Sequence, residues 1–346
     1  MRFAVVGCGY ISRVHLAALQ QIEGAEAVAV VDVNEEAARK RAEEYGIPNV
    51  YTDWNKAFKR QDVDAALICL PHKFHYRCTI DALNAGKHVL VEKVISVTME
   101  EAREMTAVAK KEGLTLMVAH MKRFDRRFEV MKEKIDQGCI GKVFLAKSEW
   151  IGPKEVFTIN PWLANKDHGG GPLSGFGSHH IDLLHWMVGL PSKVSCYTNH
   201  LVWPKIEVED TAVVILTFEN GAIGSLIYTF GATIHGQYEN ITIHGTDGTL
   251  NLVNEDLTLT SEKINGDRVP KLLNTKRADE QGIETFGKEL AIASLDPFKR
   301  EIRHFLDCVE KKLTPITDGK VAGDALNTII KAYQSAQGGV AMSFRE

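Results

Sequence analysis

The chain has 346 residues, 45% of them hydrophobic and 25% charged, which are the proportions of an ordinary folded protein. Its 45 acidic and 41 basic residues leave a formal charge of −4, so the composition gives no positive footprint for nucleic acid or for an anionic membrane surface. Six scattered cysteines without a C-x-x-C pair argue against a disulfide framework or a thiolate zinc site, and no apolar run is long enough to span a membrane. We therefore expect two domains, a small-molecule partner and a cytoplasmic location.

The first third of the chain alternates short apolar runs with amphipathic helical stretches. The runs are "RFAVVG", "AVAVVD", "AALICL", "HVLVEK" and "LTLMVAH". Near-continuous apolar runs are typical of parallel strands that helices cover on both faces. The pattern predicts a doubly wound parallel sheet, a Rossmann domain over residues 1–121.

The turn after the first of these runs carries a nucleotide-binding pattern. In "VVGCGYIS", Gly7 and Gly9 allow a tight turn and a close approach of a pyrophosphate to a helix N-terminus, and Ser12 is small enough for close helix packing. Asp32 ends the second run, where a carboxylate binds ribose hydroxyls and repels a 2′-phosphate. We expect a dinucleotide, NAD in preference to NADP; the alternative is an unrelated turn followed by a surface aspartate.

Polar residues follow the later strands, at the sheet edge where open α/β sheets bind ligands. A lysine at the end of a buried strand, as Lys93 is, needs a partner or a task because its ammonium is costly to desolvate. Lys93 is therefore a candidate active-site residue, with a purely structural ion pair to Glu92 as the alternative. The strand-end residues are Pro71, His72, His75, Glu92, Lys93, His120, Lys122 and Arg123.

The remaining residues, 122–346, have a different periodicity. We expect a helix over residues 125–137, a strand over 144–150, a long glycine-rich loop and a helix over about 178–187. "DTAVVILTFENGAIGSLIYTF" and "ENITIHGTDGTLNLV" predict hairpins with turns at Asn220-Gly221 and Asp247-Gly248. This indicates an α+β domain with a large, mostly antiparallel sheet. Because "TAVVILTF" is apolar on both alternating faces, we expect a partner subunit to cover one of them.

The segment "GGGPLSGFGSHHIDLLHW" contains a candidate acid–base pair. His179 and Asp182 are three residues apart and so share one face of the predicted helix, whereas His180 points elsewhere. No third residue has a metal-ligand spacing to this pair, so we predict that the site binds no metal. Acid–base or substrate-binding chemistry is the favoured interpretation, and a buried structural histidine is the alternative.

Taken together, the motifs resemble a known family. "GCGYIS", Asp32, Pro71 with His75, "EK" at 92–93, Arg123-Phe124 and "GGG-x-L-x-x-x-G-x-H-x-x-D" at 169–182 are similar, in order and spacing, to the Gfo/Idh/MocA oxidoreductases, named for glucose–fructose oxidoreductase and inositol dehydrogenase. The resemblance covers nearly the whole chain. It implies a Rossmann domain followed by a C-terminal α/β domain whose open sheet often forms the contacts of a homodimer or homotetramer.

The resemblance also implies roles for individual residues. Lys93 stands where the family's lysine lies beside the nicotinamide and the substrate hydroxyl, and His179 stands at the catalytic histidine. The predicted substrate-binding residues are Asp182, Arg123, His72 and Trp162. The predicted cofactor-binding residues are Gly7, Gly9, Tyr10, Ile11, Ser12, Asp32, Pro71, His75, Glu92 and Lys93. The chain departs from the family at Val94, where proline is usual, and at Gly175, where many members have an aspartate.

We therefore expect an NAD-dependent dehydrogenase that moves a hydride between the nicotinamide and a secondary hydroxyl of a sugar, cyclitol or related polyol. His179 can accept the hydroxyl proton, while Lys93 polarises the oxygen or relays the proton. A redox-neutral enzyme that retains NAD for elimination, glycoside cleavage or epimerisation is the first alternative. A sugar or dinucleotide sensor without catalysis is the second.

Overall fold

The computed structural model describes residues 1–273 and 295–345, which form two compact units. Unit 1 contains residues 1–124 and 295–326, and unit 2 contains residues 125–273 and 327–345. The helix α11 (Gly319–Gly338) is divided between them at Leu326. No helix among the described residues is both long and apolar enough to cross a membrane.

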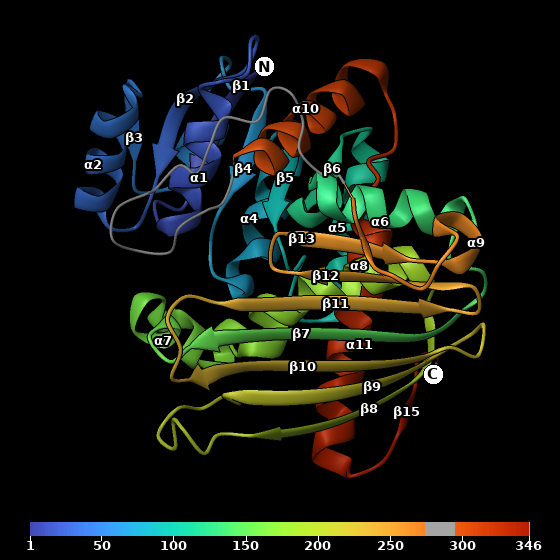
Figure 1. Ribbon diagram of the computed structural model, residues 1–346. Coiled ribbons are helices and arrows are strands. Elements are labelled where there is room, and N and C mark those ends of the chain that lie inside the picture. The colour runs from blue at the N-terminus through green and yellow to red at the C-terminus, as the bar shows by residue number, and fades with distance from the viewer. Residues whose placement is uncertain (274–294, 346) are drawn as a thin grey trace. The chain divides into compact units, whose positions relative to one another are not determined.

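Unit 1 is built on a six-stranded parallel sheet in the order β3-β2-β1-β4-β5-β6 (Figure 1). The predicted apolar runs all form strands. The structure adds the short β3, whose three residues are too few to show a strand pattern in the sequence. The strands are β1 (Arg2–Val6), β2 (Glu26–Val31), β3 (Asn49–Tyr51), β4 (Ala65–Ile68), β5 (His88–Glu92) and β6 (Leu116–Ala119). The helices are α1 (Tyr10–Leu19), α2 (Glu35–Tyr45), α3 (Trp54–Phe58), α4 (His75–Asn84), α5 (Met99–Glu112) and α10 (Asp296–Lys311).

The strand order of unit 1 reverses between β1 and β4. In such a sheet the loops leaving these two strands separate, and ligands bind beyond the carboxyl ends of the strands at that point. The core on one side is completed by α10, which packs on α1 with its apolar stripe. Phe305 of α10 lies with its ring centroid 6.0 Å from that of Phe3 on β1.

Unit 2 is a nine-stranded sheet in which neighbours are antiparallel except for the parallel pair of β7 and β10. Both predicted hairpins are present, β9 with β10 and β11 with β12. Its strands are β7 (Val143–Pro153), β8 (Pro191–Asn199), β9 (Thr211–Phe218), β10 (Ile223–Ala232), β11 (Tyr238–Gly245), β12 (Gly248–Val253), β13 (Asp256–Thr260), β14 (Lys271–Leu272) and β15 (Met342–Ser343). The predicted fold class, a doubly wound parallel sheet followed by a mostly antiparallel one, is confirmed.

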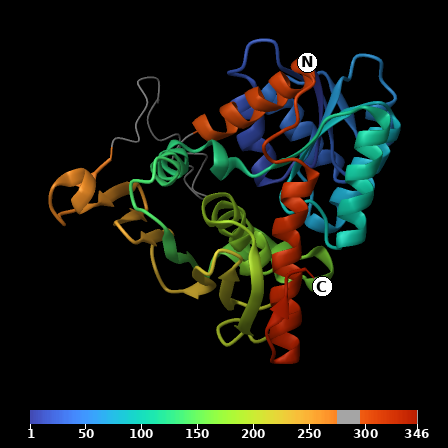
Figure 2. The same cartoon turned by 90° about the vertical axis from the view of Figure 1, so that its right-hand side faces the viewer.

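Helix α8 (Ser178–Val188) lies against one face of this sheet, as both views show (Figures 1 and 2). The other helices are α6 (Arg126–Asp136), which Asp125 caps, α7 (Val156–Ile159) and α9 (Glu262–Asn265). The prediction of a glycine-rich loop up to residue 177 is wrong at its end, because Leu173–Gly177 forms a π-helical turn that leads directly into α8. Gly175 and Gly177 are buried in this turn, so side-chain packing closes the segment into a helix where glycines alone predict a loop.

Candidate active site

The turn after β1 has the geometry of a dinucleotide-binding loop. Gly7 adopts a φ of +95°, and a Cβ at this position would lie 2.3 Å from the carbonyl oxygen of Cys69, so only glycine fits. Gly9 caps α1 in an extended conformation, and no atom lies within 4 Å of where its Cβ would be. The backbone at the N-terminus of α1 is therefore open to a phosphate group. Ser12 is buried and donates its hydroxyl to the Gly9 carbonyl at 2.8 Å.

Two charged side chains hold this turn. Asp32, directly after β2, accepts the backbone N–H of Cys8 at 2.8 Å and that of Asn34 at 2.9 Å. Arg41 of α2 donates to the carbonyl oxygens of Cys8 at 2.9 Å and of Gly9 at 3.3 Å. This role of Arg41 could not be predicted from the sequence, because the pattern of a helix does not show that one of its side chains reaches a turn about 30 residues earlier in the chain.

The residues after β4 form a short helix, and one of their side chains contacts the backbone of two loops. Pro71 leads into the short helix η1 (His72–Phe74), and His72 is almost fully buried. The ring of His75 lies between two carbonyl oxygens, with Nδ1 2.6 Å from Val94 and Nε2 2.7 Å from Leu70. Burial lowers the pKa of His75. Because both ring nitrogens are engaged, His75 ties the loop after β4 to the loop after β5.

Lys93 follows β5, and the peptide bond between Lys93 and Val94 is cis. Burial lowers the pKa of Lys93 to about 8, with the Glu92 carboxylate opposing this effect and the nearby Lys122 ammonium adding to it. An amine with this pKa exchanges its proton near neutral pH, as an acid–base group must. The Glu92 side chain points back into unit 1, where its Oε1 lies 2.7 Å from His15 Nε2.

Arg123 belongs to the short helix η2 (Met121–Phe124) after β6. Its guanidinium is buried in unit 1, and Nη1 donates to the carbonyl oxygen of Ile316 at 3.2 Å. The predicted cofactor-binding residues thus lie with His72 and Arg123 in unit 1, whereas His179, Asp182 and Trp162 belong to unit 2.

In unit 2, His179 and Asp182 lie in the first turns of α8, and both are buried. The neighbouring His180 faces a different environment, as predicted. Its Nδ1 lies 2.6 Å from the Ser148 hydroxyl on β7, and its Nε2 lies 2.6 Å from the Glu239 carboxylate on β11. This trio is enclosed in the core, so it anchors α8 to the sheet. It could not be predicted from the sequence, because its members are far apart in the chain.

The environment of Gly175 is apolar. A Cβ there would lie 3.1 Å from Leu163 Cδ2, with the Phe230 ring next to it. Trp150 stacks on Phe176 with centroids 4.1 Å apart, which extends this apolar cluster. Trp162, in the short helix η3 (Pro161–Ala164), is half-buried. A side chain at position 175, where the resemblance implies an aspartate, would therefore meet apolar groups in this chain.

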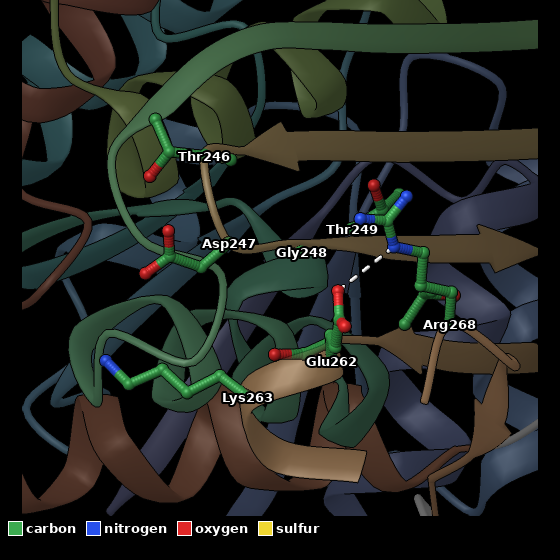
Figure 3. A pocket seen from close by; sticks show the side chains of 10 residues that line it. Thr246, Asp247, Gly248, Thr249, Glu262, Lys263 and Arg268 are labelled. Carbon is green, nitrogen blue, oxygen red and sulfur yellow. Dashed lines mark hydrogen bonds and ion pairs between the residues drawn. The ribbon is translucent and has the colours of Figure 1, made fainter. Parts of the chain in front are cut away.

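A separate hollow in unit 2 lies at the turn between β11 and β12 (Figure 3). Its charged lining includes Asp247, Lys263 and the ion pair of Arg268 with Glu262 at 3.0 Å, whose side chains are mostly exposed. It contains none of the predicted site residues. Within residues 1–273 and 295–345, no group of three or more His, Cys, Asp or Glu side chains is arranged to hold a metal ion.

Known proteins match the chain in both parts. The model of the Gfo/Idh/MocA oxidoreductase family, with its NAD-binding Rossmann fold, matches residues 1–120, and that of the GFO/IDH/MocA C-terminal domain matches residues 128–251. Myo-inositol 2-dehydrogenase of Thermotoga maritima is 30% identical over 280 residues, which are 79% of this chain and 81% of that protein. D-glucoside 3-dehydrogenase of Escherichia coli is 26% identical over 358 residues, 98% of this chain and 96% of that protein.

A solved structure agrees with these matches. The WlbA dehydrogenase of Bordetella pertussis, crystallised with NADH and UDP-GlcNAcA, has a TM-score of 0.82 and 26% identity, over 99% of this chain and 98% of that one. The family predicted from the motifs, the oxidoreductase class and the NAD cofactor are confirmed. The chain belongs to the Gfo/Idh/MocA family of NAD-binding oxidoreductases.

Proposed function

We propose that the protein is an NAD-dependent dehydrogenase that oxidises a secondary hydroxyl of a sugar, cyclitol or related polyol. The observation that carries this proposal is Lys93, an amine with a pKa of about 8 at the carboxyl end of β5 in an NAD-binding fold. In this proposal residues 1–121 bind NAD, and residues 122–346 supply substrate contacts and subunit contacts.

The turn after β1 fits the cofactor. The N–H groups at the start of α1 would bind its pyrophosphate beside Gly9, and Asp32 keeps lone pairs for the ribose hydroxyls while accepting its two backbone hydrogen bonds. Bound NAD would supply the hydride acceptor. The substrate hydroxyl must also lose a proton, and we assign its removal to Lys93 in its neutral form together with His179. Asp182, Arg123, His72 and Trp162 are the proposed substrate-binding residues.

The substrate class is supported by the relatives. The two named above are dehydrogenases of myo-inositol and of D-glucosides, which are both polyhydroxylated rings. Either free sugars or sugar nucleotides satisfy this chemistry.

A substrate screen tests the proposal directly. Sugars, cyclitols, their acids and nucleotide-linked sugars are incubated with enzyme and NAD, and absorbance is followed at 340 nm. We expect NADH to accumulate with at least one polyol. Turnover of a sugar without net NADH, by an enzyme that retains its cofactor, would instead establish the redox-neutral alternative. Binding without any turnover would establish the sensor.

We also propose a cytoplasmic location. The cysteines are buried thiols without disulfide bonds, which suits a reducing compartment. Fractionation of the producing cells, with detection of the native chain by antibody, checks this, and recovery in an extracellular or periplasmic fraction would contradict it.

A further inference from the structure

A group of buried ionisable side chains includes Glu92, the residue that precedes Lys93; of its three members, Glu92 is also among the predicted cofactor-binding residues. His15 comes from α1, Glu92 from the end of β5 and Glu301 from α10. His15 and Glu301 are fully buried, and Glu92 is 6% exposed. Buried charges need a partner or lose their charge, so the state of each member decides the charge next to Lys93.

Glu92 is held from two sides. The His15 imidazole donates Nε2–H to Glu92 Oε1 at 2.7 Å, and the backbone N–H of Lys93 donates to Oε2 at 3.2 Å. The hydrogen bond from His15 and the positive charge of Lys93 oppose the burial of Glu92, and its pKa lies below the ordinary value. The carboxylate is therefore ionised at neutral pH, and it is attached to the residue that precedes Lys93.

Glu301 is in the opposite state. Neither of its carboxyl oxygens has a hydrogen-bond partner within residues 1–273 and 295–345. Phe298 lies one turn earlier on α10, and its ring packs edge-on against the His15 ring with centroids 5.2 Å apart. The face of α10 that carries Phe298 and Glu301 therefore packs next to His15. Burial and the negative charge of Glu92 raise the pKa of Glu301 well above its ordinary value. Glu301 is therefore a neutral carboxylic acid.

Other ionisable groups also act on members of the cluster. The positive charge of Lys93 and the imidazole of His75 on α4 lower the pKa of Glu92, and the positive charge of Lys122 on η2 lowers the pKa of Lys93. The Cys69 thiol directly follows β4. Burial, together with the negative charge of Glu92, raises its pKa well above the ordinary value, so the thiol stays protonated. Burial disfavours the ammonium form of Lys93, and the Glu92 carboxylate opposes this effect.

We propose that Glu92, held by His15, is a positioning residue whose carboxylate sets how tightly Lys93 holds its proton, and that Glu301 has no such role. The catalytic consequence rests on the proposed function of Lys93. The charge of Lys93 itself can be measured without turnover.

The test is competitive acetylation of the full-length protein with acetic anhydride over a range of pH, with Lys93 followed by peptide mass spectrometry. Acetic anhydride reacts only with the neutral amine, so the midpoint of reactivity reports proton loss. In wild type we expect a midpoint near the pKa of about 8. The exposed Lys111, whose side chain is 80% accessible, is the internal reference and should not change in any variant.

Three variants separate the roles. Glu92→Gln keeps the shape and removes the charge, so the Lys93 midpoint should fall by about one pH unit, a tenfold change in its acid dissociation constant. His15→Phe removes the donor to Glu92 and should move the midpoint in the same direction. Glu301→Gln replaces one neutral group by another and should leave the midpoint unchanged. If His15→Phe does not fold, Glu92→Gln alone decides.

An unchanged midpoint in Glu92→Gln would overturn the inference. So would a shift in Glu301→Gln as large as that in Glu92→Gln, because Glu301 would then carry charge. The pH profile of kcat/KM supplies the separate check on catalysis. If acetylation shifts in Glu92→Gln while the profile does not, the inference about Glu92 stands and the proposed role of Lys93 in turnover fails.

Discussion

At the scale of single residues, Lys93 is the proposed acid–base side chain whose charge changes near pH 8. Its pKa is lowered to about 8, chiefly by burial. Because the neutral amine is the form that can take up the hydroxyl proton, we expect kcat/KM for alcohol oxidation to rise with pH and to level off above about pH 8. Initial rates with a polyol identified by the screen, between about pH 6 and pH 10, provide the measurement, and a flat profile would exclude this role.

Loss of either proposed acid–base side chain should affect turnover more than binding. We expect Lys93→Met and His179→Ala each to lower kcat by about 10²–10⁴-fold, the usual contribution of a general acid or base. NAD affinity and melting temperature should stay close to wild type. Lys111→Met, which removes an exposed lysine from α5, is the matched control and should retain full activity. Near-normal turnover with an unchanged pH profile in His179→Ala would move the base to Asp182 or Lys93.

Asp32 is expected to select NAD over NADP. Asp32→Ser removes the carboxylate that would bind the ribose hydroxyls, so NAD affinity should fall by about 10–100-fold, as for a lost hydrogen bond to a charged group. Asp32→Asn is the companion variant: it keeps one carbonyl oxygen but replaces the other carboxylate oxygen by an NH2 group, so it removes the charge and one of the two hydrogen bonds from Cys8 and Asn34. Fluorescence titration with both dinucleotides measures this. Equal affinity of the wild type for NAD and NADP would contradict the prediction.

The sequence could locate Lys93 and Asp32 because residues at strand ends share one edge of a parallel sheet, whatever the rest of the chain does. It could not predict the partners His15 and Arg41, which reach Glu92 and Cys8 only after helices have packed on the sheet. One further signal is present in the sequence. Glu301 stands between Phe298 and Phe305 at helical spacing, so a carboxyl group occupies a position that the pattern assigns to the core.

At the scale of elements, the position of α8 depends on a buried polar contact. His180 bridges Ser148 of β7 and Glu239 of β11. We expect His180→Ala to remove about 3–5 kcal/mol of stability, because it leaves a buried carboxylate without its imidazole, and hence to lower the melting temperature by about 10 °C. Ser148→Ala removes one neutral hydrogen bond and should cost only about 1 kcal/mol. Equal melting temperatures for the two variants would show that the Glu239 contact does not stabilise α8.

Elements with a strong period were predictable, and those defined by packing were not. The hairpin of β9 and β10 follows from the Asn220-Gly221 turn between two apolar runs, and α8 follows from its apolar spacing. The π-helical turn Leu173–Gly177 was predicted as a loop because its glycines favour loops when considered alone. Its conformation depends instead on contacts of Gly175 and Gly177 with Leu163 and the Tyr228 ring, which come from distant parts of the chain.

At the scale of the whole molecule, the sheet of unit 2 presents one face that suits a second copy of the chain. Helix α8 lies on the opposite face (Figures 1 and 2). On this outer face Tyr197, Val213 and Ile227 stand in register across β8, β9 and β10. Tyr197 is 73% exposed, Ile215 38% and Ile223 50%. Contiguous exposed apolar side chains on a flat sheet are typical of a surface that is buried in an assembly.

We therefore predict a homodimer or homotetramer that forms through this face. Light scattering after size exclusion should give a multiple of the 38.4 kDa chain mass. Ile215→Glu places a charge in the middle of the face and should shift the enzyme toward monomer, because an isologous contact would bring two such charges together and bury them without partners. Leu313→Glu is the control: this side chain is 53% exposed but lies in unit 1, so the mass should not change. A monomeric wild type, or an assembly that Ile215→Glu leaves intact, would show that this face is not the subunit contact.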